Sequence, residues 1–427
     1  MPPVFRHTLA FDGDAFGIFS IFKDQPHAFF LDSSLRTPRA RYSYIGFAPF
    51  TTVRDGDLKS LKKVFDKYRL IPQSLSFPAG AVGYLGYDGS LFFGFYDTII
   101  AIDHQRQRII ISSLAKSRIK DILIMLNGST GPLPRPPVDK PSFHNFVLKF
   151  QSNFTKAGYM KAVRQVLEHI RRGDIYQINL SHQLKVQIKN WQDHADPAVI
   201  YRNLRRSFPS EFGAYLDDGR QVILSASPER FLKLHKRAVQ VKPMKGTRPR
   251  GKTRAQDRIL KDQLFKSPKE IAELLMVTDL ERNDLGRVCD YKTVQVTDMR
   301  SIETYSTVFQ ATSSIEGRLR KDCDQFDLLQ AAFPSGSVTG CPKIEAMKII
   351  KKLEHGSRGL YTGVLGYMSF SGDMDFNVMI RTMFLQKDRI TFNVGGGIVA
   401  DSKPQDEWQE TWVKAEPLID TLRRSFL

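Results

Sequence analysis

Strand-like runs recur along the whole chain, and they limit its possible folds more than any other feature of the sequence. RYSYIGFAPF, RIIISSL, QVILSAS and RITFNV are alternating or aromatic runs of the kind that form strands. Helical patterns lie between such runs, one around DLKSLKKVFDKYRL and others after Ser267, Pro342 and Asp406. Because strands and helices do not alternate in repeated βαβ units, we expect an α+β protein with large sheets.

A proline-rich stretch marks the clear internal boundary. GPLPRPPVDKP (131–141) has five prolines in eleven residues, which is typical of a linker or a long crossing connection. The chain has 427 residues, more than most single domains. We therefore expect an N-terminal subdomain over residues 1–141 that packs on a core over residues 142–427.

The composition indicates a soluble, cytoplasmic protein. The longest apolar runs are far shorter than the roughly 20 residues of a membrane span, and the N-terminus has no secretory signal. Three scattered cysteines predict neither a disulfide framework nor a Cys-x-x-Cys metal site. The net charge of +18 is spread along the chain, so we expect a basic surface that attracts small anions, and neither a nucleic-acid nor a membrane partner.

The segment GTRPRGKT (246–253) matches the phosphate-loop pattern G-x-x-x-x-G-K-[ST]. It follows a predicted strand, and LLMVTD (274–279) is similar to the acidic strand that holds magnesium in such proteins. However, Pro249 has no N–H to offer a phosphate, and Arg248 and Arg250 stand where small residues let N–H groups converge. A nucleotide-binding protein is therefore one alternative, and a basic nucleic-acid-binding protein is another.

Lys245, directly before this segment, is a candidate nucleophile. A free lysine has a pKa of about 10.4 and is almost fully protonated at pH 7, whereas a nucleophile must be neutral. Burial and the neighbouring cations Lys242, Arg248 and Arg250 favour the neutral form. The alternative is an ordinary exposed lysine at the end of a strand.

Two Glu-x-x-Glu pairs on predicted helices are candidate ligands of Mg²⁺. Glu270 and Glu273 lie one turn apart in the first helix, where Glu270 would close a capping box. Glu407 and Glu410 share a face of the last helix with Lys414, which could hold a carboxylate beside them. Facing helices would present oxygen ligands suited to Mg²⁺. The alternative is a cap residue and solvated charges.

Three further features are typical of anion recognition. Arg381 lies inside the apolar strand pattern FNVMIRTMFL, where an unpaired guanidinium is costly. Gly395, Gly396 and Gly397 follow another predicted strand and allow close backbone approach. The loop SGSVTG leads into a helix begun by Pro342, whose N-terminal N–H groups could face a carboxylate. An internal salt bridge, a β-bulge and a plain helix cap are the respective alternatives.

Together these segments resemble the chorismate-utilising enzymes, a family that includes the first components of anthranilate synthase and aminodeoxychorismate synthase and the isochorismate and salicylate synthases. The similar motifs run in family order from about Tyr159 to the C-terminus: DIYQINLS, SASPERFL, KPMKGTRPRG, SPKEIAELLMVTDLERNDLGR, FPSGSVTGCPKIEAM, RGLYTGVLGY, FNVMIRTM and FNVGGGIVADSKPQDEWQETWVKA. The resemblance implies a two-subdomain α/β sandwich with two large antiparallel sheets and flanking helices, in which residues 142–427 form a chorismate-binding catalytic domain. It also implies that the phosphate-loop match is a coincidence, because Lys252 falls in a variable loop.

The resemblance further implies roles for particular residues. Glu273 and Glu410 would bind Mg²⁺, and Glu270 and Glu407 would contribute through water. Glu229 of SASPER would be the general acid for the departing 4-hydroxyl group. The residues that hold the substrate or line its site would be Thr247, Ser337, Tyr361, Arg381, Gly395, Gly396, Gly397 and Lys414.

Two positions select the chemistry within the family. Gln177 stands where the isochorismate and salicylate synthases, which add water, have a lysine, so it favours ammonia as the nucleophile. Lys245 stands where anthranilate-type members typically have alanine, and it is similar to the lysine of aminodeoxychorismate synthase component I. In those members the lysine attacks C2 of chorismate as the 4-hydroxyl leaves, and ammonia then displaces it by attack at C4.

The implied reaction converts chorismate and ammonia to 4-amino-4-deoxychorismate, on the route to 4-aminobenzoate and folate. Gln310 replaces a histidine that is common in anthranilate-type members, which agrees with the absence of pyruvate elimination. Ammonia would come from a separate glutamine amidotransferase subunit, because the chain contains no glutaminase-like segment. Anthranilate synthase component I is the alternative within the family.

Overall fold

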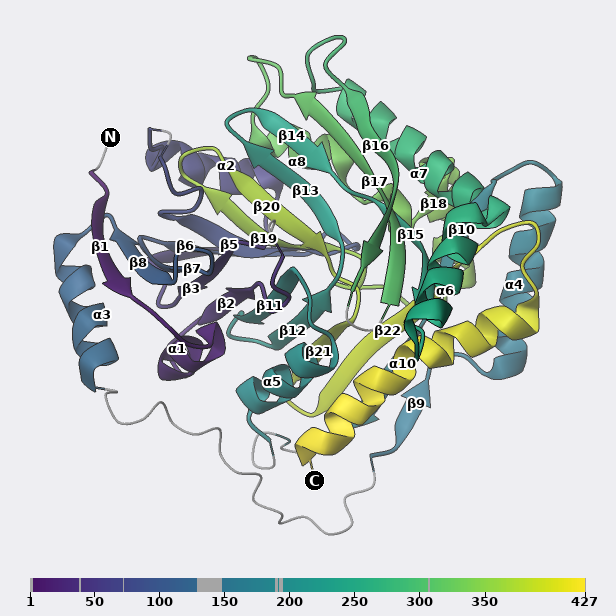
Figure 1. Ribbon diagram of the computed structural model, residues 1–427, viewed down its shortest axis with the longest axis horizontal. Coiled ribbons are helices and arrows are strands. Elements are labelled where there is room, and N and C mark those ends of the chain that lie inside the picture. Colours follow the sequence, from purple (N-terminus) through teal and green to yellow (C-terminus); the bar gives the residue numbers. More distant parts are fainter. Residues whose placement is uncertain are drawn as a thin grey trace.

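Two antiparallel sheets lie face to face and carry helices on their outer surfaces in this computed structural model (Figure 1). The structure describes residues 3–37, 40–71, 73–128, 148–188, 191, 195–305 and 308–426. The predicted α+β class with two large antiparallel sheets is confirmed.

The larger sheet has twelve strands. Their spatial order is β1 (Phe5–Ala10), β8 (Arg108–Ser113), β7 (Thr98–Asp103), β3 (Tyr42–Gly46), β2 (Phe29–Asp32), β11 (Phe212–Asp217), β12 (Val222–Ser227), β21 (Thr382–Gln386), β22 (Arg389–Ile398), β10 (Gln177–Gln187) and β18 (Gly340–Cys341), with β9 (Phe150–Ser152) also paired to β10.

The second sheet has ten strands. Their order is β15 (Met244–Pro249), β17 (Val308–Arg318), β14 (Ala238–Val241), β13 (Arg230–His235), β20 (Met374–Val378), β19 (Val364–Ser369), β5 (Gly80–Leu85), β6 (Leu91–Tyr96) and β4 (Thr51–Arg54), with β16 (Gln295–Thr304) also paired to β17.

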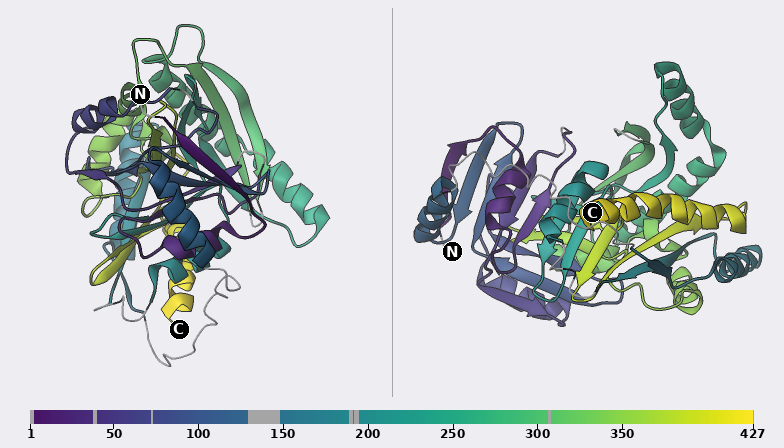
Figure 2. Two further views of the ribbon diagram at one scale, coloured as in Figure 1. Left: turned by 90° about the vertical axis from the view of Figure 1, so that its left-hand side faces the viewer. Right: turned by 90° about the horizontal axis from the view of Figure 1, so that it is seen from below.

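Ten α-helices and a short 3-10 helix belong to the described residues. They are α1 (Ala15–Phe22), α2 (Leu58–Lys67), α3 (Lys116–Gly128), α4 (Lys156–Arg171), α5 (Pro197–Ser207), α6 (Arg254–Lys266), α7 (Pro268–Gly286), η2 (Gly336–Val338), α8 (Gln325–Ala332), α9 (Lys343–Leu353) and α10 (Pro404–Phe426). Most of them pack against a sheet, whereas α6 projects from the body of the molecule (Figure 2).

Strands from the two ends of the chain share both sheets. In the larger sheet β2 pairs with β11, and in the smaller sheet β5 pairs with β19. The predicted linker at 131–141 lies outside the described residues, and the division of the chain at residue 141 stays a prediction.

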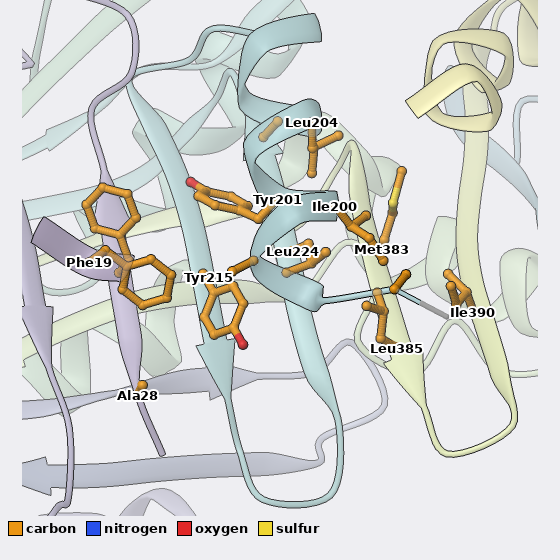
Figure 3. Packing of buried hydrophobic residues seen from close by; sticks show 14 of the residues in the cluster. Phe19, Ala28, Ile200, Tyr201, Leu204, Tyr215, Leu224, Met383, Leu385 and Ile390 are labelled. Atoms are coloured by element: carbon orange, nitrogen blue, oxygen red, sulfur yellow. The ribbon is translucent and has the colours of Figure 1, made fainter. Parts of the chain in front are cut away.

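Apolar side chains fill the space between the sheets and cover the outer face of the larger one. Between the sheets the rings of Phe77 and Tyr367 stack with their centroids 4.4 Å apart. On the outer face Tyr201 and Leu204 of α5 pack toward Leu224 of β12 (Figure 3). Helix α10 lies beside α5 and across β22, so the sheet fixes the position of α10.

The helices predicted after Ser267 and Pro342 are confirmed, whereas α10 begins at Pro404, before the predicted start at Asp406. Asp57 caps α2 by accepting the N–H of Ser60 at 2.8 Å. Ser267 caps α7 by accepting the N–H of Glu270 at 3.4 Å. The predicted capping box is wrong, because the Glu270 carboxylate accepts a hydrogen bond from Arg248 instead of returning to the cap.

Three strand predictions also need correction. FNVMIRTMFL is not one strand: β20 ends at Val378 in the smaller sheet, and β21 begins at Thr382 in the larger sheet. Arg381 therefore lies in the crossover between the sheets. The three consecutive glycines 395–397 lie inside β22 rather than after a strand, and Lys245 lies near the start of β15 rather than at the end of a strand.

The phosphate-loop alternative conflicts with the structure. Residues 246–249 belong to β15 and pair with β17 instead of forming a loop. The N–H of Gly251 donates to Asp257 Oδ1 at 2.6 Å, and the N–H of Lys252 donates to Gln256 Oε1 at 2.9 Å. These donors are already satisfied, so the segment forms no phosphate cradle.

All three cysteines are free, with Cys289 and Cys323 buried and Cys341 half-buried. In the part of the chain that the structure describes, every helix is too short or too polar to cross a bilayer.

A buried histidine joins β10 to its neighbours. His182 Nδ1 lies 2.9 Å from Ser152 Oγ on β9, and its Nε2 lies 3.0 Å from Thr411 Oγ1 on α10. Its ring stacks on Trp408, with centroids 5.1 Å apart. Burial lowers the pKa of His182 to about 4, so the imidazole is neutral at pH 7.

This histidine should make stability depend on pH. The unfolded chain, with a histidine pKa of about 6.5, binds the proton more readily than the folded chain, so stability present above pH 6.5 is lost as the pH falls toward 4. Between pH 7 and 4.5, the free energy of unfolding of the wild type should fall by about 1–3 kcal/mol more than that of His182→Gln. Chemical denaturation at a series of pH values measures this. His104, whose pKa burial also lowers to about 4, is present in both proteins. Equal pH slopes would contradict the prediction.

Candidate functional site

Most of the predicted site residues lie where β22 and β10 meet β15, α7 and α10 (Figure 1). Gln177 begins β10, and its ladder partner Cys341 belongs to the short strand β18. Strand β18 follows residues 335–338, which include η2 and which we call the Ser337 segment. Glu273 of α7 lies against the same strand end, because its Oε2 is 3.5 Å from Gln177 Nε2. We call this group, with Lys245 and the α10 carboxylates, the candidate site.

Gly397 lets Gln177 and Glu273 approach the backbone of β22. It stands opposite Asn179 in the ladder. A methyl group at this position would lie 2.5 Å from Gln177 Nε2 and 3.7 Å from Glu273 Oε2. Gln177 is almost fully buried, and its Oε1 has no hydrogen-bond partner among the described residues. An amide with a free acceptor at this point is suited to contact a substrate or ammonia.

The α10 carboxylates reach the preceding glycine. A methyl group at Gly396 would lie 3.4 Å from Glu407 Oε2 and 3.5 Å from Glu410 Oε1. Lys414 Nζ lies 2.7 Å from Glu410 Oε1 and donates to the carbonyl of Gly395 at 2.9 Å. Both predicted Glu pairs therefore send carboxylates to adjoining residues of one strand, which the sequence alone does not establish.

The carboxylates of the two pairs differ in how nearby charges balance the effect of burial. Burial raises the pKa values of Glu273 and Glu407. For Glu410, burial acts in the same direction, but the ammonium of Lys414 outweighs it and the pKa is lowered. The Glu270 carboxylate lies beside β15, where Arg248 Nη1 is 3.2 Å away.

The donor chemistry of this group fits Mg²⁺. All four predicted ligands are carboxylates, which Mg²⁺ prefers, and the raised pKa values of Glu273 and Glu407 mark negative charges that a cation would stabilise. Among the described residues, however, no three His, Cys, Asp or Glu side chains have metal-binding spacing. Mg²⁺ keeps several waters and shares anionic groups of its substrate, so a site that protein ligands alone leave incomplete is compatible with it.

Lys245 and Glu229 meet at the Ser337 segment. Lys245 Nζ donates to the carbonyl of Ser337 at 3.1 Å. Burial lowers the pKa of Lys245, although Glu273 and Glu229 act in the opposite direction. Burial raises the pKa of Glu229 to about 7, and a hydrogen bond from Ser337 and the charge of Lys245 limit the rise. Both groups are thus shifted toward their neutral forms.

Gly246 makes room for the bend of β15 beside Lys245. Its φ of +73° lies in the left-handed region, and the ladder to β17 shifts register between Lys245 and Thr247. A methyl group there would lie 2.6 Å from Glu270 Oε2. A side chain at this position would therefore strain the backbone and displace Glu270.

Three predicted residues have no direct contact with Lys245 or the carboxylates. Thr247 is exposed on β15. Tyr361 is buried beside Arg358, and burial raises its pKa to about 12. The Arg381 guanidinium lies 5.3 Å from the ring centroid of Phe208, and no carboxylate in the described part of the chain pairs with it. Burial lowers its pKa, and such a partly buried, unpaired guanidinium is suited to bind an anion.

Sequence reasoning missed two buried charged groups behind the site. Glu281 Oε1 accepts hydrogen bonds from Ser335 Oγ at 3.0 Å and the N–H of Gly336 at 2.8 Å. Arg358 forms a buried ion pair with Glu354 at 2.7 Å. Their signal in the sequence is a charged residue within the motifs DLERN and RGLYTG that form part of the resemblance.

Comparison with known proteins gives a family, relatives and solved structures that are similar to this chain. The sequence pattern of the family described as chorismate binding enzyme matches residues 29–420. Anthranilate synthase component 1 of Thermus thermophilus is 34% identical, over 92% of this chain and 92% of its own. Aminodeoxychorismate synthase of Streptomyces pristinaespiralis is also 34% identical, over 97% of this chain, which spans 64% of that relative's length. The crystal structure of anthranilate synthase component I from Streptococcus pneumoniae has a TM-score of 0.78 and 30% identity, over 90% of this chain and 93% of that chain.

The glycines of β22 supply a matched pair of variants. A methyl group at 397 would lie 2.5 Å from Gln177 Nε2, so Gly397→Ala must displace the amide. We expect the KM for chorismate to rise about tenfold or more, which corresponds to about 1.4 kcal/mol of lost binding. At 396 the nearest atom would lie 3.4 Å away, an ordinary contact, so Gly396→Ala should have a smaller effect. Steady-state kinetics measure both, and a larger effect at 396 than at 397 would contradict this account.

Proposed function

We propose, since this chain belongs to the chorismate binding enzyme family, that it aminates chorismate at C4 and forms 4-amino-4-deoxychorismate. Its family makes it an enzyme that uses chorismate. The finer assignment concerns which product leaves the site. One observation carries it, namely a lysine in the candidate site whose surroundings favour the neutral, nucleophilic form.

The environment of Lys245 supports a role as nucleophile. Its ammonium has no paired carboxylate at salt-bridge distance among the described residues, and its hydrogen bond goes to the neutral carbonyl of Ser337. Burial lowers its pKa, so a larger fraction is neutral near pH 7 than for a free lysine. An alanine at this position would offer neither a nucleophile nor a hydrogen-bond donor.

Glu229 supports the same chemistry from the other side of the Ser337 segment. With a pKa of about 7 it carries a proton in about half of the molecules at neutral pH. The Lys245 lone pair would form a bond to C2 while the ring double bonds shift and the C4–O bond breaks. Glu229 would give its proton to the departing oxygen, which leaves as water. Ammonia would then attack C4, reverse the shift and release the lysine.

Three groups would hold the reactants. Arg381, unpaired in the described structure, and Lys414 are the cations available for the substrate carboxylates. Gln177, whose Oε1 is free, can accept a hydrogen bond from ammonia. Ammonia is mostly protonated at neutral pH, which favours delivery of the free base by a glutamine amidotransferase subunit.

Mg²⁺ is the proposed metal. Glu273 and Glu410 would hold it, with Glu270 and Glu407 contributing through water. When bound, Mg²⁺ supplies positive charge that neutralises a carboxylate of the substrate and fixes its orientation.

Anthranilate synthase component I is the second candidate, favoured by the relative from Thermus thermophilus at the same 34% identity. The two candidates differ at two positions. The first is Lys245, because anthranilate-type members typically have alanine there and form their product without this lysine. The second is Gln310, which pairs with Thr247 across the β15–β17 ladder.

A product assay distinguishes these candidates. Purified protein is incubated with chorismate, Mg²⁺ and ammonium at alkaline pH, and the products are identified by mass spectrometry. We expect the wild type to form 4-amino-4-deoxychorismate and Lys245→Ala to lose at least about 100-fold in rate, because the covalent step is removed. Lys252→Ala is the control, since its side chain is exposed at the start of α6 and should leave the rate unchanged. Anthranilate as the product would assign the chain to the second candidate.

A further inference from the structure

We propose that Arg358 is a positioning residue for the candidate site, where its guanidinium holds the Ser337 segment, strand β10 and Tyr361 in the arrangement that turnover requires. The inference rests on chorismate turnover at this site, as proposed above, but not on which product is formed.

Arg358 binds the main chain of two separate segments. It is 4% exposed. Its Nη1 donates to the carbonyl of Val338 at 2.8 Å, and its Nη2 donates to the carbonyl of Asn179 at 2.7 Å. Glu354 fixes the guanidinium in this orientation by accepting from Nε at 2.8 Å and from Nη2 at 2.7 Å. Such a fork of donors with fixed geometry is available to arginine but not to lysine.

Both carbonyls lie next to groups of the candidate site. Val338 follows Ser337, whose own carbonyl accepts the hydrogen bond from Lys245 Nζ. Asn179 stands opposite Gly397 in the β10–β22 ladder. Arg358 therefore links the segment that holds Lys245 to β10, the strand paired with the glycines of β22, and none of its hydrogen bonds among the described residues goes to Lys245 or to the α10 carboxylates.

A strained residue beside Tyr361 supports the same role. Thr362 has a φ of 61° and is fully buried, although β-branched residues rarely adopt this region. Its N–H donates to the carbonyl of Met379 at 3.0 Å, and Arg358 Nη1 donates to its hydroxyl at 3.3 Å. Such strain persists only where surrounding contacts enforce it, and it occurs often at functional sites. These contacts hold the turn that presents Tyr361.

A largely buried arginine elsewhere in the fold, with 12% of its side chain exposed, provides the comparison. Arg205 of α5 pairs with Asp32 at 2.7 Å and with Asp14 at 2.9 Å. Its side-chain hydrogen bonds among the described residues all go to these two carboxylates. Replacement of Arg205 should thus weaken the fold in a similar way but leave the Ser337 segment in place.

The experiment compares Arg358→Lys with Arg205→Lys in chorismate consumption with Mg²⁺ and ammonium, whatever the product. We expect Arg358→Lys to lower kcat at least about tenfold with less than a threefold change in KM, because displacement of a reacting group by about 1 Å costs about 100-fold. Arg205→Lys should lower the Tm by about as much as Arg358→Lys does, but its kcat should stay within about twofold of the wild-type value. A kcat that falls equally in both variants, or in neither, would overturn the proposal.

Two further variants cover the remaining outcomes. If Arg358→Lys does not fold, Glu354→Gln replaces it in the experiment. This variant keeps the shape of the pair but frees the guanidinium, so the kcat of the enzyme should fall at least threefold. An unchanged kcat would overturn the proposal. In a Lys245→Ala background, Arg358→Lys should have much less effect than in the wild type, because coupled residues are not additive. If the wild type instead forms anthranilate, the proposed function fails, while the kcat and KM of Arg358→Lys still decide the role of Arg358.

Discussion

The hydrogen-bonded ladder between β10 and β22 is the interaction on which the candidate site depends. It runs from Ile178 opposite Ile398 to Gln187 opposite Arg389. Its glycine end leaves the backbone uncovered where α7 and α10 bring their carboxylates together. Strand β22 supports α10, whereas α7 packs against β15, β16 and β17 of the smaller sheet. Glu354, the C-cap of α9, accepts a hydrogen bond from Ser181 of β10, and Thr411 of α10 is hydrogen-bonded to His182. A shift of this ladder by one residue would move every one of these contacts to the other face.

Burial shapes the chemistry of the site as much as position does. An acid and a base placed together in water would exchange a proton and remain an ion pair. Around Ser337 the low polarity raises the pKa of Glu229 and lowers that of Lys245, so the pair is shifted toward the neutral forms. The α10 group behaves differently, because Lys414 is close enough to keep Glu410 ionised. An ion pair of Glu410 and Lys414 thus lies in the same region as Glu229 and Lys245, whose pKa values are shifted toward the neutral forms. Such an arrangement is typical of catalytic sites.

Local sequence patterns predicted local structure well and long-range structure poorly. The cap Ser267 identified its helix, because capping depends on neighbours in the chain. Arg381 was misplaced inside a strand, because the apolar pattern on either side is the same whether the chain continues in one sheet or crosses to the other. The resemblance named the residues of the candidate site, but their convergence on Gly396 and Gly397 depends on pairing between distant strands. Arg358 was overlooked because its role depends on hydrogen bonds to the distant backbone carbonyls of Val338 and Asn179, which leave no mark in a sequence.

The sharing of both sheets by the two ends of the chain has a consequence for shortened forms of the protein. The N-terminal strands β2 and β5 complete the hydrogen bonding of β11 and β19 in the middle of each sheet. A chain that began after residue 128 would retain every candidate catalytic residue, yet it would present two long rows of unpaired N–H and C=O groups beside exposed apolar faces. Such edges recruit strands from other molecules. We therefore expect the N-terminal third to cover these edges, and a gene fragment that lacked it to encode the candidate site on a scaffold prone to aggregate.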